Sequence, residues 1–574
     1  MIKRVLPYMR KYRINAFLSP VAMVLEVLAD IGVPFLMSRI VDVGIKTRDI
    51  DYVVRTAVLM IVVALLGMLM GILSSFMGAK AGYGFAAELR QAAYRKIQTY
   101  SFANIDEMSV PSLITRLTTD CNLVGQVTMM TLRMAVRAPS MMVFALIMAA
   151  NLNAELAKIF VVAIPLVFTL FAVIFRKVHP MFRKIQEKID GINAITREDL
   201  AGIRVIKSFN RQDYEAARFD ERNADLMDST IRAVMWIILL FPIMNLIVYS
   251  VIISALWFGG HQIVAGTMLS GELMAFTTYI GQIMMSLMMV SMYIMMATRG
   301  RASLARIIEV LDVNSEIIES EDPLKSVADG SVSFFDVCFR YPGYRDDILK
   351  DINLAIRSGE CIGIIGSTGS SKSTLVQMIP RLYDVSHGEV LVGGKNVKEY
   401  DIQTLRDEVA VVLQKNTLVT GTIRSNMKWG DENASDKEII RALKQAQAWE
   451  FVSGYEDGLE HRVEQGGGNF SGGQRQRLTI ARALIKKPKI LILDDSTSAV
   501  DMATDAKLRK TFSEELDGIT TIIVAQRIAS IEDSDRIIVM ERGAVESVGT
   551  HEELLGKSAI YREIYESQKG GIAQ

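Results

Sequence analysis

Six apolar stretches of roughly 20 residues each dominate the first 310 residues of this chain. They lie near positions 14–37, 56–77, 134–151, 159–175, 234–258 and 273–297. An α-helix rises ~1.5 Å per residue, so about 20 apolar residues match the ~30 Å hydrocarbon core of a bilayer. One such stretch fits a buried helix of a soluble protein, but six of them separated by charged segments are typical of a multi-pass membrane domain. We therefore expect six membrane-spanning helices surrounded by lipid.

The net charge of zero is a cancellation between two parts of the chain. Residues 1–310 carry 32 Lys and Arg against 22 Asp and Glu, whereas residues 311–574 carry 32 against 42. Basic residues gather at the N-terminus and in the second-to-third and fourth-to-fifth connections, which the positive-inside rule places in the cytoplasm. The acidic second part offers nucleic acid no electrostatic footprint, which argues against a soluble ATPase that acts on DNA.

The two basic connections are about 50 residues long, keep a helical periodicity and contain almost no Pro or Gly. Structureless loops of that length are uncommon, so we expect the membrane helices to continue far into the cytoplasm. The sequence predicts turns near 109–117 and 197–209, where the membrane domain could contact a cytoplasmic partner.

Four charged side chains interrupt the apolar stretches. Glu26 and Asp30 lie one helical turn apart near the middle of the first, where an ionised group either pairs within the bundle or lines a cavity for a cationic substrate. Arg133 and Arg137 have the same spacing at the start of the third, and we expect them to reach the membrane interface.

The sixth apolar stretch is rich in methionine. Flexible thioethers suit an adaptable surface for varied apolar ligands, and they equally suit lipid contact and helix packing. The residues concerned are Met284, Met285, Met288, Met289, Met292, Met295 and Met296. Both interpretations remain open at this stage.

After residue 310 the composition changes to a polar, acidic segment, and short β-rich runs then alternate with helical patterns. This alternation is the signature of an α/β domain. We expect a transmembrane domain over 1–310, a linker over 311–330 and an α/β domain over 331–574.

The segment CIGIIGSTGSSKSTLVQMI indicates a phosphate-binding loop between a buried strand and a helix. In such a loop the backbone N–H groups face an anion, Lys372 reaches the β- and γ-phosphates, and the Ser373 hydroxyl binds Mg²⁺. The loop comprises Gly366, Ser367, Thr368, Gly369, Ser370, Ser371, Lys372, Ser373 and Thr374. Ser371 stands where the full motif has Gly.

Two further segments point to the same chemistry. In KILILDDSTSAVD, Asp494 follows four apolar residues and would bind Mg²⁺ through water at the carboxyl end of a parallel strand. In NFSGGQRQRLTIARAL, Ser471, Gly472 and Gly473 begin a basic helix whose N-terminus suits another phosphate.

With these motifs in this order after six apolar stretches, nearly the whole chain resembles the ATP-binding cassette (ABC) exporters. The resemblance implies a multidomain membrane protein with an all-α, six-helix transmembrane domain, long cytoplasmic helical extensions and a P-loop nucleotide-binding domain. That α/β domain would carry helical and antiparallel β subdomains, and two such domains would sandwich two ATP molecules with Mg²⁺.

The same resemblance implies roles for individual residues. Tyr341 matches the aromatic residue that stacks on adenine, and Gln414 matches the glutamine that contacts Mg²⁺ and senses the γ-phosphate. Residues Ser471 to Gln474 match the signature motif, which completes the ATP site of the opposite chain. Residues Ser498 to Asp501 match the loop that bridges two cassettes.

Three departures from the family pattern fall in one ATP site. Asp495 replaces the catalytic glutamate, and its shorter side chain should hold the attacking water poorly. Gln526 replaces the switch histidine and carries no positive charge to stabilise the transition state. With Ser371, both belong to the site built on this chain's own P-loop, whereas the signature motif is intact. We therefore expect a heterodimer with a second, non-identical half-transporter, in which this chain's own site hydrolyses ATP poorly. A slowly hydrolysing homodimer and an ATP-binding regulatory or gating subunit are the alternatives.

The expected function is ATP-driven export of a hydrophobic or amphipathic substrate, as in multidrug-type exporters. Without a signal or transit peptide at its start, the chain is expected in a bacterial inner membrane, with the N-terminus and cassette in the cytoplasm. Its three cysteines, Cys121, Cys338 and Cys361, have no metal-binding or CxxC spacing and are expected to be structural.

Overall fold

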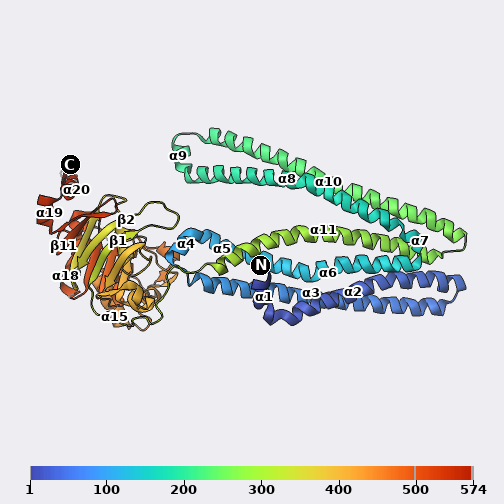
Figure 1. The fold of residues 1–574 in the computed structure, drawn as a ribbon, viewed down its shortest axis with the longest axis horizontal. Helices are drawn as coiled ribbons and strands as arrows, with labels where there is room; N and C mark the ends of the chain where they lie inside the picture. Colours follow the sequence, from blue (N-terminus) through green and yellow to red (C-terminus); the bar gives the residue numbers. More distant parts are fainter. Residues whose placement is uncertain (1, 497–499, 517, 571–574) are drawn as a thin grey trace. The chain divides into compact units, whose positions relative to one another are not determined.

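A computed structural model describes residues 2–496, 500–516 and 518–570. The chain divides into two compact units, Met1–Ile97 with Pro111–Asp312 and Gln98–Val110 with Val313–Gln574. The described part of the first unit consists of helices joined by short turns, and the second unit holds the β-sheets (Figure 1).

Among the described residues, six helical segments are long and apolar enough to cross a membrane: Lys3–Ile45, Ile50–Ile97, Val110–Leu152, Ala154–Ala201, Gln212–Val264 and Ser270–Asp312. The helices within them are α1 (Ile2–Met9), α2 (Arg13–Arg39), α3 (Ile50–Ile97), α5 (Val110–Thr115), α6 (Cys121–Leu152), α7 (Ala154–Ala157), α8 (Ile159–Ala201), α10 (Gln212–Val264) and α11 (Ser270–Asp312). The expected multi-pass helical domain is thus confirmed.

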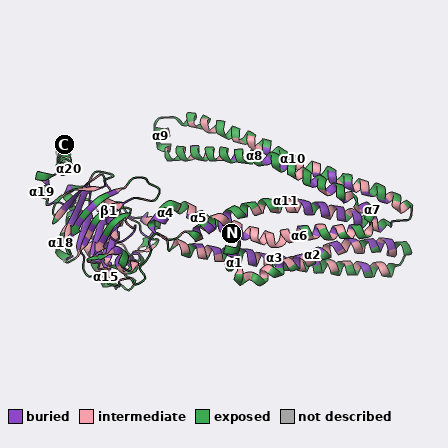
Figure 2. Cartoon of the chain, viewed as in Figure 1, coloured by how far each residue is buried: buried purple, intermediate pink, exposed green. Residues whose placement is uncertain are grey.

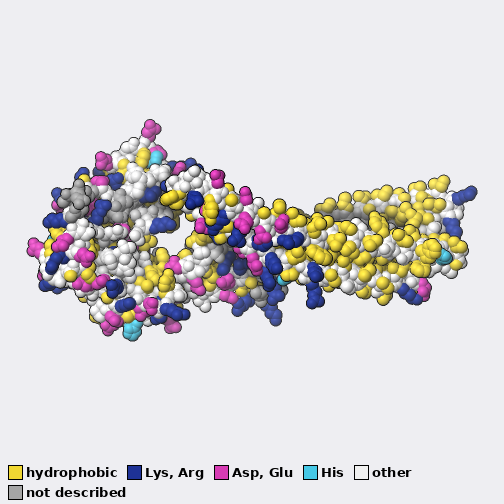
Figure 3. Space-filling view, turned by 90° about the horizontal axis from the view of Figure 1, so that it is seen from above, with side chains coloured by type: hydrophobic (Ala, Val, Ile, Leu, Met, Phe, Trp, Pro, Cys, Tyr) yellow, Lys and Arg dark blue, Asp and Glu magenta, His cyan; other side chains and the backbone are white. Residues whose placement is uncertain are grey.

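These segments are much longer than a membrane requires. They run for 43 to 53 residues, which corresponds to roughly 65–80 Å of helix against ~30 Å of hydrocarbon. Hydrophobic side chains cover one end of the helix bundle, and Lys, Arg, Asp and Glu gather over the other part (Figure 3). The helices therefore continue well beyond the apolar band.

Small residues allow the membrane helices to approach closely. Ser19 of α2 and Ser74 of α3 donate hydrogen bonds to each other's backbone carbonyl, at 2.9 and 3.0 Å. Where α3 meets α6, a Cβ on Gly82 would lie 2.6 Å from the Gly125 carbonyl oxygen. Long stretches of these helices are exposed (Figure 2), and many of the exposed side chains are large and apolar. Small residues at the helix contacts are typical of membrane bundles.

The charged side chains of α2 form ion pairs within the bundle. Arg137 of α6 pairs with Glu26, and its Nη2 donates to Asp30 Oδ2 at 2.8 Å. The expectation that Arg137 reaches the membrane interface is therefore wrong, because two carboxylates on the neighbouring helix hold the guanidinium inside the bundle. The expected pairing of the two acids within the bundle is borne out.

The first of the two turns belongs to the second unit. After α3 ends at Ile97, the helix α4 (Phe102–Met108) is capped by Ser101, and the chain enters α5 at Val110. Ser109 adopts a φ of +55°, which ends α4, and Pro111 favours a new helix start. The reversal thus precedes the predicted stretch 109–117, most of which already belongs to the next long segment.

The second turn contains a short helix, α9 (Ile203–Ser208), between the ends of α8 and α10. It lies inside the stretch 197–209. Its side chains Val205 and Ile203, and the following Phe209, are exposed.

The described residues of the second unit form an α/β domain with three sheets, of which the smallest pairs β7 with β8. A six-stranded sheet has the order β12-β11-β3-β10-β9-β6, with all neighbouring strands parallel except β12, and a four-stranded antiparallel sheet has the order β2-β1-β4-β5. The strands are β1 (Val332–Phe339), β2 (Leu349–Ile356), β3 (Cys361–Gly366), β4 (His387–Val392), β5 (Lys395–Asn396), β6 (Val409–Val412), β7 (Gly421–Thr422), β8 (Arg462–Val463), β9 (Ile490–Asp494), β10 (Thr520–Val524), β11 (Arg536–Glu541) and β12 (Ala544–Gly549).

Helices cover the large sheet and form a separate helical part between β6 and β9. They are α12 (Lys372–Gln377), α13 (Ile402–Glu408), α14 (Ile423–Met427), α15 (Asp436–Gln445), α16 (Trp449–Val452), α17 (Gly472–Ile485), α18 (Met502–Glu515), α19 (His551–Lys557) and α20 (Ala559–Gly570). Strands β9 and β10 are buried throughout, as expected for the centre of a parallel sheet covered on both faces. The carboxyl ends of β3, β9 and β10 meet at one edge, which becomes the candidate site.

Candidate nucleotide site

The loop between β3 and α12 has the shape of a phosphate cradle. Gly366 ends the strand where a Cβ would lie 2.1 Å from the Met540 carbonyl oxygen, so only glycine fits there. Gly369 follows with a φ of +84°, and the Ser370 N–H donates to the Ser367 carbonyl at 3.1 Å, which closes the bend beside Thr368. The remaining N–H groups and the start of α12 are available to an anion.

Ser371 occupies a left-handed position. Its φ of +72° and ψ of 25° place it in the αL region directly before α12, and its side chain does not cap the helix. A residue with a Cβ pays roughly 1–2 kcal/mol for this conformation, whereas glycine does not. Ser371 therefore carries local backbone strain that glycine at this position would not.

Lys372 folds back over the loop. Its ammonium donates to the Gly366 carbonyl at 2.8 Å, the Ser367 carbonyl at 3.0 Å and the Ser370 hydroxyl at 3.2 Å. Burial lowers the pKa of Lys372, and the nearby charges of Asp495 and Asp494 oppose this shift. A bound phosphate would compete with the loop oxygens for the same three donors.

Ser373 and Asp494 meet beneath the loop. The Ser373 hydroxyl donates to Asp494 Oδ1 at 2.8 Å, and Asp494 is buried at the end of β9. Burial raises the pKa of Asp494, with a further contribution from the charge of Asp495, against the lowering effect of the Ser373 hydrogen bond and of Lys372. Neighbouring ligands of an octahedral Mg²⁺ lie about 3 Å apart, so these two oxygens fit such an ion.

Asp495 is held by two glutamine amides. Gln526 Nε2 donates to Asp495 Oδ2 at 2.7 Å, and Gln414 Nε2 lies 3.4 Å from the same oxygen. The Asp495 backbone has a φ of +50°, and its N–H donates to the Val524 carbonyl at 3.0 Å. The structure therefore brings together the three residues that sequence reasoning linked to hydrolysis.

Two glutamines that the motifs did not identify donate hydrogen bonds to the backbone carbonyls of Asp495 and Gln526. Gln476 of α17 is buried and donates to the Asp495 carbonyl at 3.2 Å. Gln568 of α20 donates to the Gln526 carbonyl at 2.8 Å and accepts from the Ile528 N–H at 2.9 Å. Gln476 could have been noticed as a polar residue on the buried face of its helix, whereas nothing in the sequence near Gln568 signals its contact.

An aromatic cluster connects the adenine-stacking candidate to the first turn. The Tyr341 hydroxyl lies 3.1 Å from the Thr374 hydroxyl, and its ring packs edge-on against Tyr383 at 5.3 Å between centroids. The Tyr383 hydroxyl donates to Asp106 Oδ2 of α4 at 2.6 Å, and Phe102 contacts the same ring. Burial, followed by the Asp106 hydrogen bond, raises the pKa of the Tyr383 hydroxyl. Sequence reasoning missed Tyr383.

The signature segment forms a well-capped helix start. Ser471 caps α17, since its hydroxyl accepts from the Gln474 N–H at 3.2 Å and its N–H donates to the Gln474 side chain at 2.9 Å. Gly472 and Gly473 are the first two residues of α17, and Ser471 at the N-terminus of this helix is exposed. Among the described residues, no recorded hydrogen bond joins this helix start to the phosphate loop.

The bridging loop is described in part. Ser498 and Ala499 lie outside the described residues. Asp501 caps α18 by accepting from the Thr504 N–H at 3.0 Å and hydroxyl at 2.8 Å. These hydrogen bonds lower the pKa of Asp501 and keep its carboxylate charged.

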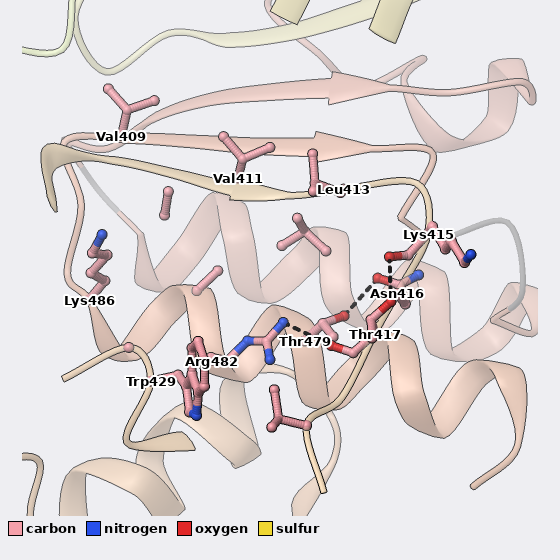
Figure 4. Close-up of a pocket in the computed structure, with 15 residues that line it drawn as sticks. Val409, Val411, Leu413, Lys415, Asn416, Thr417, Trp429, Thr479, Arg482 and Lys486 are labelled. Carbon is pink, nitrogen blue, oxygen red and sulfur yellow. Dashed lines mark hydrogen bonds between the residues drawn. The ribbon is translucent and has the colours of Figure 1, made fainter. Parts of the chain in front are cut away.

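A hollow of about 420 Å³ lies beside the segment that follows Gln414 (Figure 4). Asn416 accepts a hydrogen bond from the Thr479 hydroxyl at 2.8 Å, and the Thr417 carbonyl accepts from Arg482 at 3.2 Å. The loop after Gln414 is thus attached directly to α17, the helix that begins at the signature segment.

Taken with the fold, this arrangement defines a P-loop nucleotide-binding domain fused to a six-helix membrane domain. Residues 16–287 match the ABC transporter transmembrane region family, and residues 349–498 match the ABC transporter family. The chain belongs to the ABC transporters, as a half-transporter of the exporter type.

Relatives cover almost the whole chain. An uncharacterized ABC transporter ATP-binding protein, YfiB of Bacillus subtilis, is 36% identical over 99% of both chains. An ATP-dependent lipid A-core flippase of Desulfotalea psychrophila is 29% identical over 99% of both. The solved structure of a bacterial Atm1-family ABC exporter with ATP bound has a TM-score of 0.80 at 23% identity, covering 98% of each chain, and shows the shared fold.

Proposed function

We propose that this chain is one half of a heterodimeric, multidrug-type exporter that moves a hydrophobic or amphipathic substrate across a bacterial inner membrane. Its own P-loop would form an ATP site that hydrolyses slowly. Its signature segment, Ser471 to Gln474, would complete the competent site of a second, non-identical chain.

One observation carries the proposal: the carboxylate of Asp495 is engaged by Gln526 and Gln414. A general base must accept a proton from the attacking water, and both the shorter side chain and the two amide donors reduce that capacity. Gln526 adds no positive charge for the transition state. The strain at Ser371 lies in the same site, while the helix start at Ser471 keeps its cap.

In this proposal each group of residues has one task. The phosphate loop and Lys372 would hold the triphosphate, Ser373 and Asp494 would hold Mg²⁺, and the ion would neutralise phosphate charge when bound. With hydrolysis slow, the site would keep the two cassettes together between cycles.

Closure of the cassettes would reach the membrane domain through the turns. For α4, the support is a chain of two contacts: the ring of Tyr341 packs against Tyr383, and the Tyr383 hydroxyl donates a hydrogen bond to Asp106 of α4. A ligand that stacks on Tyr341 would therefore act on the turn through Tyr383. In the second turn, the exposed helix α9 would receive the movement of a cassette. The membrane domain would then alternate between inward- and outward-facing states.

The test is to measure ATP hydrolysis by the purified chain alone, by the cassette chain encoded beside its gene, and by the two together. We expect the pair to be at least ten times as active as this chain alone. Equal activity of the lone chain would favour the homodimer. Passive substrate flux through the pair without vanadate-sensitive turnover would favour a regulatory or gating subunit.

A further inference from the structure

A cavity of about 370 Å³ lies between α6 and α11 in the membrane domain. Its wall includes Arg137 and Met141 of α6 and Gln282, Met285 and Met289 of α11. A volume of this size lies within the range of small-molecule sites, ~300–1,000 Å³. The cavity is separate from the nucleotide site.

The charged residue in the cavity wall is Arg137, and the ion-pair group that it forms with Glu26 and Asp30 has a net negative charge. Arg137 pairs with Glu26 and Asp30, so one cation faces two carboxylates. The Glu26 Oε2 atom is buried and has no hydrogen-bond partner among the described residues. In the low dielectric of a membrane domain an excess negative charge acts over a longer range than in water, and it favours a cationic occupant.

One polar atom in the wall is a buried acceptor without a partner among the described residues, the Oε1 atom of Gln282. The Gln282 amide nitrogen donates to the Asp30 carbonyl at 3.2 Å, which leaves the buried Oε1 atom without a partner among the described residues. The Ser286 hydroxyl donates to the Ile283 carbonyl at 2.7 Å. The guanidinium of Arg137 is engaged by its two carboxylates. An occupant that donates a hydrogen bond would therefore satisfy the Gln282 Oε1 atom, whereas an occupant without a donor would leave it unpaired.

The remaining wall is formed by thioethers. Met141, Met285 and Met289 line the cavity, and methionine packs adaptably and contacts aromatic rings favourably through sulfur. Of the methionines in α11, Met284 is instead buried in the bundle and Met292 is exposed outside the cavity. The methionine-rich helix thus divides into packing residues and cavity residues.

We propose that this cavity binds amphipathic cations, with the positive, N–H-bearing end toward Gln282 and the apolar or aromatic body against Met141, Met285 and Met289. The inference names the substrate class of the proposed exporter and rests on that function for its role in transport. Binding itself requires neither ATP nor a partner chain.

The test measures binding of rhodamine 6G, an aromatic cation with N–H groups, to the full chain in lipid nanodiscs without nucleotide, by fluorescence anisotropy. Tetraphenylphosphonium and tetraphenylborate, which have the same shape and opposite charge, serve as competitors. We expect tetraphenylphosphonium to displace the dye at a concentration at least ten times lower. Gln282→Met should weaken dye binding roughly tenfold, and Met292→Leu on the same helix should leave it unchanged.

The selectivity between the two competitors distinguishes a binding effect from misfolding. Asp30→Asn removes the excess charge, so the preference for tetraphenylphosphonium should fall at least fivefold, and this ratio does not depend on the fraction of folded protein. Absence of dye binding, equal displacement by both ions, or an unchanged ratio in Asp30→Asn would overturn the inference. Intact binding with no ATP-driven dye movement by the two-chain complex would instead refute export.

Discussion

The double substitution Asp495→Glu with Gln526→His should convert this chain's own ATP site into a faster one. In the structure Asp495 Oδ2 lies 2.7 Å from Gln526 Nε2 and 3.4 Å from Gln414 Nε2. Glutamate extends the carboxylate by about 1.5 Å, one carbon–carbon bond. A misplacement of about 1 Å can cost ~100-fold in rate, which corresponds to about 2.7 kcal/mol of barrier.

Phosphate release by the lone chain in nanodiscs is the assay, with binding of a fluorescent ATP analogue measured in parallel. We expect an increase of between about 10- and 100-fold in kcat, because the lone chain can supply an intact signature segment from a second copy. Adding Lys372→Ala should abolish the gain. Unchanged hydrolysis with unchanged nucleotide affinity would show that the Asp495 arrangement does not limit the rate.

Three further predictions concern stability and coupling. Ser371→Gly should raise the free energy of unfolding of the cassette by about 1 kcal/mol, measured by thermal unfolding, and a decrease would contradict the left-handed strain. Tyr383→Phe removes a hydrogen bond to a carboxylate worth ~1.5–3 kcal/mol. Substrate transport per ATP hydrolysed should therefore fall in the two-chain complex. An unchanged ratio would show that this contact does not couple the cassette to the membrane domain. Arg137→Met should destabilise the membrane domain by ~3–5 kcal/mol by leaving two carboxylates without their partner, and converting both acids of α2 to amides as well should restore most of the loss; equal instability of the combined variant would refute the ion-pair account.

The fold was largely predictable because its strongest signals are local. Six apolar stretches need no tertiary information to indicate six spanning helices, and the strand before Gly366 and the strand before Asp494 are continuous buried runs. Parallel strands place their carboxyl ends at one edge, so the proximity of Ser373 to Asp494 follows from topology.

What the sequence could not predict depends on contacts between distant segments. Arg137 was assigned to the interface from its place at the start of an apolar stretch, but its partners lie more than 100 residues earlier in the chain. The role of Tyr383 could not be predicted, because it depends on contacts with Tyr341 and with Asp106, which are distant from it in the sequence. The short helix α4 before the predicted stretch 109–117 had no separate signal in the sequence, because α4 and α5 are both helical and only the φ of Ser109 separates them.

In the proposed heterodimer this chain contributes its signature segment to the active ATP site and its phosphate loop to the slow one. The most direct measurement compares ATP hydrolysis by the two-chain complex carrying either Ser471→Ala or Lys372→Ala in this chain alone. We expect Ser471→Ala to remove most of the activity, because it disrupts the competent site, and Lys372→Ala to leave the greater part of it. Equal losses, or a larger loss for Lys372→Ala, would contradict the assignment of the two sites.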